Sequence, residues 1–160
     1  RDRIRLTFAG SGPQEAALWR LCGRLSLMVR FLVPDDDELA DLYAAADLFL
    51  HAGESELEGM SVLQAMAAGV PALVSDSPMS AARELSPVEA SRFRFPDAAD
   101  LARRMDALLA DPVAYAALSA ANHAAVQTLE HGRQVDRLEA IYRSLIEKSL
   151  PASTTDAPET

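Results

Sequence analysis

At 160 residues the chain is long enough for one domain with one sizeable core, and 49% of its residues are apolar, as in ordinary globular proteins. Its 15 basic and 24 acidic residues give a formal net charge of −9, which argues against binding to nucleic acid or to an anionic membrane because both would repel this surface. No apolar run approaches the roughly 20 residues of a membrane span, and no signal peptide is visible. The expected location is therefore the cytoplasm, with membrane association only through segments outside this chain.

Strands and helices are predicted to alternate along the chain. Short apolar runs predict five strands, at residues 4–9, 28–33, 48–50, 72–74 and 93–95. Helical periodicity predicts helices at residues 16–25, 35–46, 59–68, 97–110, 113–129 and 133–147. This alternation predicts an α/β fold over residues 1–150, a Rossmann-like parallel sheet flanked by helices, with a helical C-terminus. Residues 151–160 are polar and are predicted to be disordered.

Four local signals refine the predicted boundaries. Pro13 suits the first position of a helix, where its missing N–H costs nothing. Asp35 and Glu38 have the spacing of a capping box, and Gly69 is placed to end the third helix. The strand at residues 48–50 is continuously apolar, which predicts burial on both faces of the sheet.

The functional site is expected at one edge of the sheet, because ligands of open parallel sheets bind beyond the carboxyl ends of the strands. The segment that follows the third strand carries three carboxylates, Glu54, Glu56 and Glu58, just before a helix. Unpaired N–H groups at the start of that helix, around residues 59–61, would attract an anion such as a phosphate. The carboxylates could accept hydrogen bonds from sugar hydroxyls, or they could merely cap the helix.

Two other clusters invite a chemical reading. Asp35, Asp36 and Asp37 imitate an Asp-x-Asp metal motif, but they also open a helix, where acidic residues are favoured by the helix dipole. Capping is the preferred interpretation. His51, at a strand end, could reach a substrate or could serve the structure, and the three histidines of the chain have no metal-ligand spacing.

One long motif resembles a known family. Residues 45–50 read Ala-Ala-Asp-Leu-Phe-Leu, and residues 56–71 contain Glu-Leu-Glu-Gly-Met-Ser-Val-Leu-Gln-Ala-Met-Ala-Ala-Gly-Val-Pro. This pattern is similar to the family-four retaining glycosyltransferases of the GT-B fold, whose signature is a glutamate, seven residues and a second glutamate, followed by Ala-Met-Ala-x-Gly-x-Pro. The similarity covers about residues 4–147. It implies that the chain is one half of a GT-B fold, the C-terminal half that binds the donor.

The resemblance implies a role for each matching residue. Glu56 matches the first glutamate, which faces the transferred sugar, and is the expected catalytic residue. Gln64 replaces the second glutamate, which bonds the ribose, and an amide can still accept and donate there. The other expected donor-binding residues are Gly59, Met60, Ser61, Val62, Gly10, Gly12 and Val33. Leu57 and Glu58 stand where many members have Gly-Phe, so the resemblance does not indicate which sugar the donor carries.

The implied function is transfer of a hexose from a nucleotide-diphosphate sugar to an acceptor hydroxyl with retention, without a metal ion or other cofactor. The family's phosphate-clamping basic residues and its acceptor domain would precede Arg1, where the chain opens almost directly on a strand. The chain is therefore expected to be a fragment, inactive alone. Two alternatives remain: a degenerate, non-catalytic GT-B-like interaction domain, which Gln64 favours, and a nucleotide-sugar epimerase of the same architecture.

Overall fold

The structure is a computed structural model that describes residues 4–86 and 88–149. The strands of this part are β1 (Arg5–Ala9), β2 (Met28–Leu32), β3 (Phe49–His51), β4 (Ala72–Ser75) and β5 (Arg92–Phe93). The helices are α1 (Glu15–Arg24), α2 (Asp36–Ala44), α3 (Met60–Ala67), α4 (Ala82–Leu85), α5 (Ala98–Ala110), α6 (Pro112–Gln127) and α7 (His131–Ser149), with a 3₁₀ helix at Glu89–Ser91. The expected alternation of strands and helices is confirmed. The disorder predicted for residues 151–160 falls outside the described residues.

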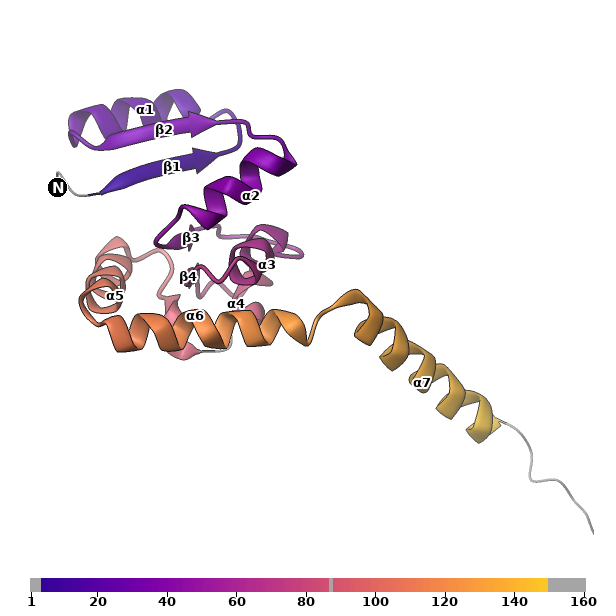
Figure 1. Cartoon of the computed structure of the whole chain (residues 1–160). Helices are drawn as coiled ribbons and strands as arrows, with labels where there is room; N and C mark the ends of the chain where they lie inside the picture. The colour runs from indigo at the N-terminus through magenta and orange to yellow at the C-terminus, as the bar shows by residue number, and fades with distance from the viewer. Residues whose placement is uncertain (1–3, 87, 150–160) are drawn as a thin grey trace, which may run out of the picture.

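All described strand pairs are parallel, as expected, but the strands form two sheets instead of one. β1 pairs with β2, so that Arg5 lies opposite Met28. The other sheet has the order β3-β4-β5, with Phe49 opposite Ala72 and Val74 opposite Arg92. In Figure 1, α1 covers the β1–β2 pair, and α2 leads from that pair to β3. No described backbone ladder joins β1 to β3, and this divides the expected sheet in two.

The division explains a wrong prediction about β3. Its three residues, Phe49 to His51, are only half-buried, whereas all four residues of β4 are buried. β4 is hydrogen-bonded on both edges, while β3 has a described partner on one edge only. The apolar run at residues 48–50 thus marks a strand that is partly open, not one enclosed on both faces.

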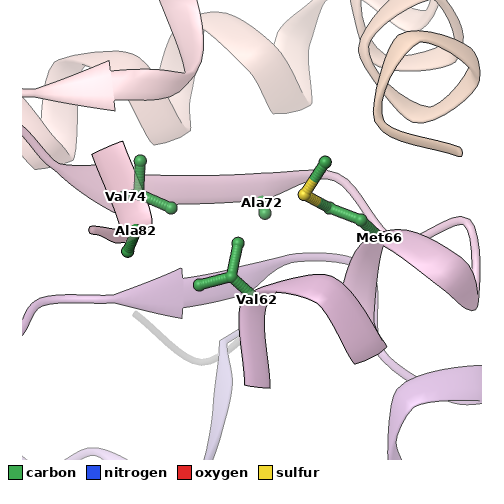
Figure 2. Packing of buried hydrophobic residues seen from close by; sticks show 5 residues of the cluster. All are labelled: Val62, Met66, Ala72, Val74 and Ala82. Carbon is green, nitrogen blue, oxygen red and sulfur yellow. The ribbon is translucent and has the colours of Figure 1, made fainter. Parts of the chain in front are cut away.

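The main core lies where α3 packs against β4. Val62 and Met66 of α3 meet Ala72 and Val74 of β4, and Ala82 of α4 closes the cluster (Figure 2). Each of the five side chains is at most 2% exposed. Burying a side chain of valine or methionine size contributes roughly 1.5–3 kcal/mol. α3 is therefore fixed to the sheet by two adjacent turns, and its N-terminus is held in place.

Helix boundaries follow the predicted caps with one exception. The Asp35 and Glu38 side chains form a complete capping box at the start of α2, and Gly69 has a φ of 78° just after α3. Pro13 was expected to be the first residue of α1, but the helix begins at Glu15. The Glu15 N–H donates to the Gly12 carbonyl at 3.1 Å, so a tight turn precedes the helix and places Pro13 within that turn.

The last two helices differ in how they contact the rest of the molecule. α6 is tied to the core by the Ser119 hydroxyl, which donates to the Gly69 carbonyl at 2.5 Å, and by the Tyr115 hydroxyl, which donates to the Asp47 carbonyl at 2.8 Å. α7 extends away from the body in Figure 1, and the apolar side chains along it are exposed. Across the described residues, the helices all fall short of the length and apolarity needed to cross a membrane.

Candidate functional site

The loop between β3 and α3 is held from behind by the loop that follows β4. The Ser75 hydroxyl donates to the Gly53 carbonyl at 2.5 Å, and the Ser77 hydroxyl donates to the Glu54 carbonyl at 2.6 Å. Both serines are buried, so these bonds are shielded from water. The carboxylate-bearing loop is therefore fixed at two successive peptide units before it reaches Glu56.

The backbone of Glu56 is fixed on both sides of the residue. Its N–H donates to the Met79 carbonyl at 3.3 Å, and its carbonyl accepts from the Ala81 N–H at 2.8 Å. These bonds form a single parallel bridge between the two loops, next to Ser80. The backbone of Glu56 is thus fixed, and with it the point from which its side chain starts.

The Glu56 carboxylate is held ionised by the turn that it caps. Its Oε1 accepts from the Gly59 and Glu58 N–H groups, both at 3.1 Å, and its Oε2 lies 3.3 Å from His51 Nε2. The Gly59 N–H, followed by that of Glu58 and by His51, lowers the pKa of Glu56 from 4.5 to about 2. The carboxylate therefore closes the turn before α3 but does not cap the helix itself, since the N-cap of α3 is Gly59, without a side-chain cap hydrogen bond. A carboxylate has about four lone-pair sites, so the three bonds leave capacity for a ligand.

Gly59 makes the turn possible. It caps α3 with left-handed backbone angles, φ 72° and ψ 32°, which favour glycine. A Cβ at this position would lie 2.6 Å from Leu85 Cδ1 and 3.4 Å from the Ala82 Cα. Both the backbone conformation and the approach of α4 therefore select glycine between Glu56 and the helix.

The start of α3 leaves two backbone donors available. The Val62 N–H donates to the Gly59 carbonyl at 2.9 Å, and the Gly59 N–H is taken by Glu56. Within the described residues, the N–H groups of Met60 and Ser61 have no hydrogen-bond partner. Of the expected donor-binding residues in this turn, these two present free N–H groups at the positive end of the helix dipole.

Gln64 lies one turn further along α3, exposed, and Tyr43 contacts it. The Tyr43 hydroxyl is 3.4 Å from Gln64 Oε1 and 3.2 Å from the Ser61 carbonyl. Burial raises the pKa of Tyr43, so it stays a neutral donor. This contact orients the carbonyl oxygen of Gln64 toward the protein and leaves its NH₂ group for a ligand. Tyr43 was not among the site residues expected from the sequence, because nothing in the sequence indicates where its hydroxyl points.

The remaining expected site residues lie at the carboxyl ends of β1 and β2. The Gly10 N–H donates to the Leu32 carbonyl at 2.7 Å, and its φ is 134°. Space around Gly12 is open, and Val33 is 75% exposed directly after β2. Among the described residues, no hydrogen bond joins these three to the Glu56–Gln64 segment. Their donor-binding role stays a prediction.

Asp35 caps a helix, and His51 lies against Glu56. The Asp35 carboxylate accepts from the Glu38 N–H at 2.9 Å as the cap of α2, and in residues 4–86 and 88–149 no three His, Cys, Asp or Glu side chains gather as metal ligands. The His51 side chain is 12% exposed, contacts Glu56, and has a buried Nδ1 without a hydrogen-bond partner. His51 therefore supports the Glu56 carboxylate from the end of β3.

Several known proteins are similar to this chain. Residues 1–125 match the family described as "Glycosyl transferases group 1". A Corynebacterium glutamicum GDP-mannose-dependent monoacylated alpha-(1-6)-phosphatidylinositol monomannoside mannosyltransferase is 31% identical over 79% of this chain and 35% of its own length. A Mycobacterium tuberculosis GDP-mannose-dependent alpha-(1-6)-phosphatidylinositol dimannoside mannosyltransferase is 38% identical over 44% of this chain and 19% of its own. The chain thus spans about a third or less of these relatives.

Solved structures share the fold. The catalytic domain of Helicobacter pylori cholesterol-alpha-glucosyltransferase is 25% identical, with a TM-score of 0.76 over 80% of each chain. Anabaena HepE, in complex with UDP and glucose, is 22% identical, with a TM-score of 0.70 over 87% of this chain and 39% of its own. The sheet architecture, the Glu56–Gln64 segment and the family match agree, and the chain belongs to the glycosyl transferases group 1 family, with the architecture of one half of a GT-B fold.

Proposed function

We propose that residues 1–150 are the C-terminal, donor-binding domain of a retaining glycosyltransferase. The complete protein would transfer a hexose from a nucleotide-diphosphate sugar to an acceptor hydroxyl, with a second domain that binds the acceptor. The similarity to GDP-mannose-dependent mannosyltransferases favours GDP-mannose as the first donor to test. No metal ion is proposed, because N–H groups of α3 and basic residues of the complete protein would neutralise the leaving diphosphate.

The observation that carries this proposal is the pairing of an ionised carboxylate with free backbone donors. Glu56 precedes by a few residues the Met60 and Ser61 N–H groups, which have no hydrogen-bond partner in the described structure. A diphosphate bound at these N–H groups would place the anomeric carbon on the side of Glu56. As the diphosphate leaves, that carbon gains positive charge, and a fixed carboxylate with a pKa of about 2 stabilises it at any working pH.

Gln64 is proposed to bind the ribose of the donor. It lies eight residues after Glu56, about one turn into α3, and so faces a more remote part of the donor. Its NH₂ group can donate to a ribose hydroxyl, where the family glutamate accepts from one. Tyr43 holds the amide in this orientation, so the replacement of glutamate by glutamine keeps one hydrogen bond to the donor.

Glu56→Gln in the full-length protein is the decisive experiment. The amide oxygen can still accept from the Gly59 and Glu58 N–H groups, so the turn is kept while the negative charge is lost. We expect kcat to fall about 10²–10³-fold with little change in donor affinity, because the lost interaction grows in the transition state. Glu147→Gln is the matched control: it removes an exposed carboxylate from α7, outside the candidate site, and should leave kcat unchanged.

The outcomes separate the competing functions. A Glu56→Gln protein with normal kcat and a raised KM would make Glu56 a binding residue. A full-length protein that binds donor but transfers no sugar to any acceptor would support the degenerate domain. Interconversion of nucleotide sugars without an acceptor would identify an epimerase. NMR of the product anomer would test retention.

A further inference from the structure

A polar pocket lies beside α4 and is lined by residues outside the Glu56–Gln64 segment. It has a volume of about 310 Å³ and opens between the ends of β4 and β5, α4 and α5. Its walls are charged: Asp76, Arg83, Glu89, Arg92, Arg94, Asp100 and Arg104. Four guanidinium groups thus meet three carboxylates around one pocket, on a protein whose overall charge is −9.

Asp100 and Arg104 neutralise each other. The Asp100 carboxylate accepts from Arg104 Nε at 3.1 Å, from an Arg103 NH₂ group at 2.9 Å and from the Arg94 N–H at 2.7 Å. The Arg94 N–H, followed by the two guanidinium groups, lowers the pKa of Asp100 to about 2. Arg104 also donates to the carbonyls of Glu89 and Ala90. This pair builds the wall of the pocket and has little capacity left for a ligand.

The other three arginines keep free donors. Arg92 donates once, to the Ser86 carbonyl at 3.0 Å, and its Nε is buried without a hydrogen-bond partner. Arg83 Nε is also buried without a hydrogen bond, although Glu84 and Asp76 carboxylates lie 3.3 and 3.6 Å away as ion pairs of poor geometry. The Arg94 side chain is 74% exposed and is paired only loosely, at 3.7 Å, with Asp97.

Buried guanidinium donors without acceptors cost free energy unless a ligand or water satisfies them. Arg83, Arg92 and Arg94 approach the pocket from α4, β5 and the residue after β5, so they can surround one compact ligand. The ligand that fits three planar donors is an anion with several oxygens, such as a phosphate group, which arginine binds through paired N–H···O bonds. We propose that this pocket binds a phosphate group through Arg83, Arg92 and Arg94.

This site is separate from the proposed donor site. None of the pocket-lining residues belongs to the Glu56–Gln64 segment. α4 lies between the two, since Ala82 and Leu85 approach Gly59 while Arg83 of the same helix lines the pocket. A phosphate group in the pocket would hold α4 by Arg83, and α4 packs against the Gly59 turn. The proposal does not depend on the function proposed above.

Calorimetric titration of the full-length protein with inorganic phosphate at low ionic strength tests the pocket. We expect one saturable site whose affinity falls at least tenfold in Arg92→Gln and in Arg94→Gln. The exposed Arg94 is the safer variant, because its removal leaves the Asp100 network intact. Asp76→Asn removes a competing carboxylate and should tighten phosphate binding several-fold. Arg143→Gln, on α7, removes one charge from a remote exposed ion pair and serves as the matched control.

If phosphate instead bound at the start of α3, its affinity would be the same in all these variants. The variants therefore distinguish that location from the pocket. Methyl phosphate in place of inorganic phosphate separates a phosphate ester from the free ion as the natural ligand. Identical phosphate isotherms for the wild-type, Arg92→Gln and Arg94→Gln proteins would overturn the proposal. Equal weakening in Arg143→Gln would also overturn it, because the effect would then reflect net charge instead of the pocket.

Discussion

Gly59→Ala should destabilise the turn that carries the candidate site. Alanine at φ 72° pays about 1–2 kcal/mol for the left-handed conformation, offset in part by about 0.4–1 kcal/mol from the stiffer unfolded chain. Its Cβ would also lie 2.6 Å from Leu85 Cδ1, which must leave its rotamer at about 0.5–1.5 kcal/mol. The net loss should be about 2 kcal/mol.

Urea unfolding of the full-length protein measures this loss, and hydrogen exchange of the amides in α3 locates it. Gly23→Ala is the control with the opposite sign. Gly23 lies inside α1 with open space around its Cβ position, so alanine there should stabilise by about 0.5–1 kcal/mol.

A double variant separates the two contributions at Gly59. In a Leu85→Ala background the steric contact is gone, and Gly59→Ala should cost about 1 kcal/mol less than in the wild type. An equal cost in both backgrounds would show that α4 does not restrain the turn. A neutral Gly59→Ala would refute the left-handed cap itself and, with it, the orientation of the Met60 and Ser61 N–H groups.

Two further predictions concern the same segment. Because the folded-state pKa of Glu56 is depressed, its ionisation stabilises the fold above the ordinary value of 4.5, and this contribution is lost as the pH falls toward about 2. Glu56→Gln should therefore flatten the loss of unfolding free energy between pH 5 and 2, and an unchanged slope in acid titrations followed by circular dichroism would contradict the pKa shift. Gln64→Ala should weaken the binding of nucleoside diphosphate about tenfold, as measured by calorimetry, since one hydrogen bond contributes about 1 kcal/mol. Gln64→Glu should leave this affinity unchanged or raise it. Tyr43→Phe should weaken binding by a smaller factor, because Tyr43 only orients Gln64. Unchanged affinity in Gln64→Ala would mean that the ribose contact is absent.

The sequence alone predicts most of the fold because its signals here are local. The capping box at Asp35 and the left-handed glycine at residue 69 act within one turn of helix, and both are confirmed. The parallel arrangement also follows, since each strand is followed by a helix that must return the chain. The failures concern longer-range features. The burial of residues 48–50 depends on what pairs with the other edge of β3, which no local pattern contains.

The candidate site also has parts that the sequence predicts and parts that it does not. The Glu56 motif and the helix start are visible in the sequence, because the spacing of their residues is fixed by one loop. Tyr43 is not, because it meets Gln64 from another helix, 21 residues away. The charged pocket was also missed. Arg83, Arg92 and Arg94 come from α4, β5 and the residue after β5, and α4 had not been predicted at all. Scattered arginines in an acidic chain look like ordinary surface charge.

The hydrogen bonds that hold the Glu56 carboxylate in the turn are compatible with the catalytic role proposed for it. The Gly59 and Glu58 N–H groups that close the turn on Glu56 are the groups that lower its pKa, and His51 adds to the effect. A carboxylate without these bonds would move among rotamers and would need to reorganise as positive charge develops. Here the orientation is already fixed by the fold, and fixed charges of this kind contribute most to transition-state stabilisation. Glutamine at position 56 would keep the hydrogen bonds of the turn and lose the charge, so the unfolding free energy should fall only modestly at neutral pH while turnover falls by a far larger factor. A loss of turnover that merely follows the fraction of unfolded protein would mean that the carboxylate acts only through the stability of the turn.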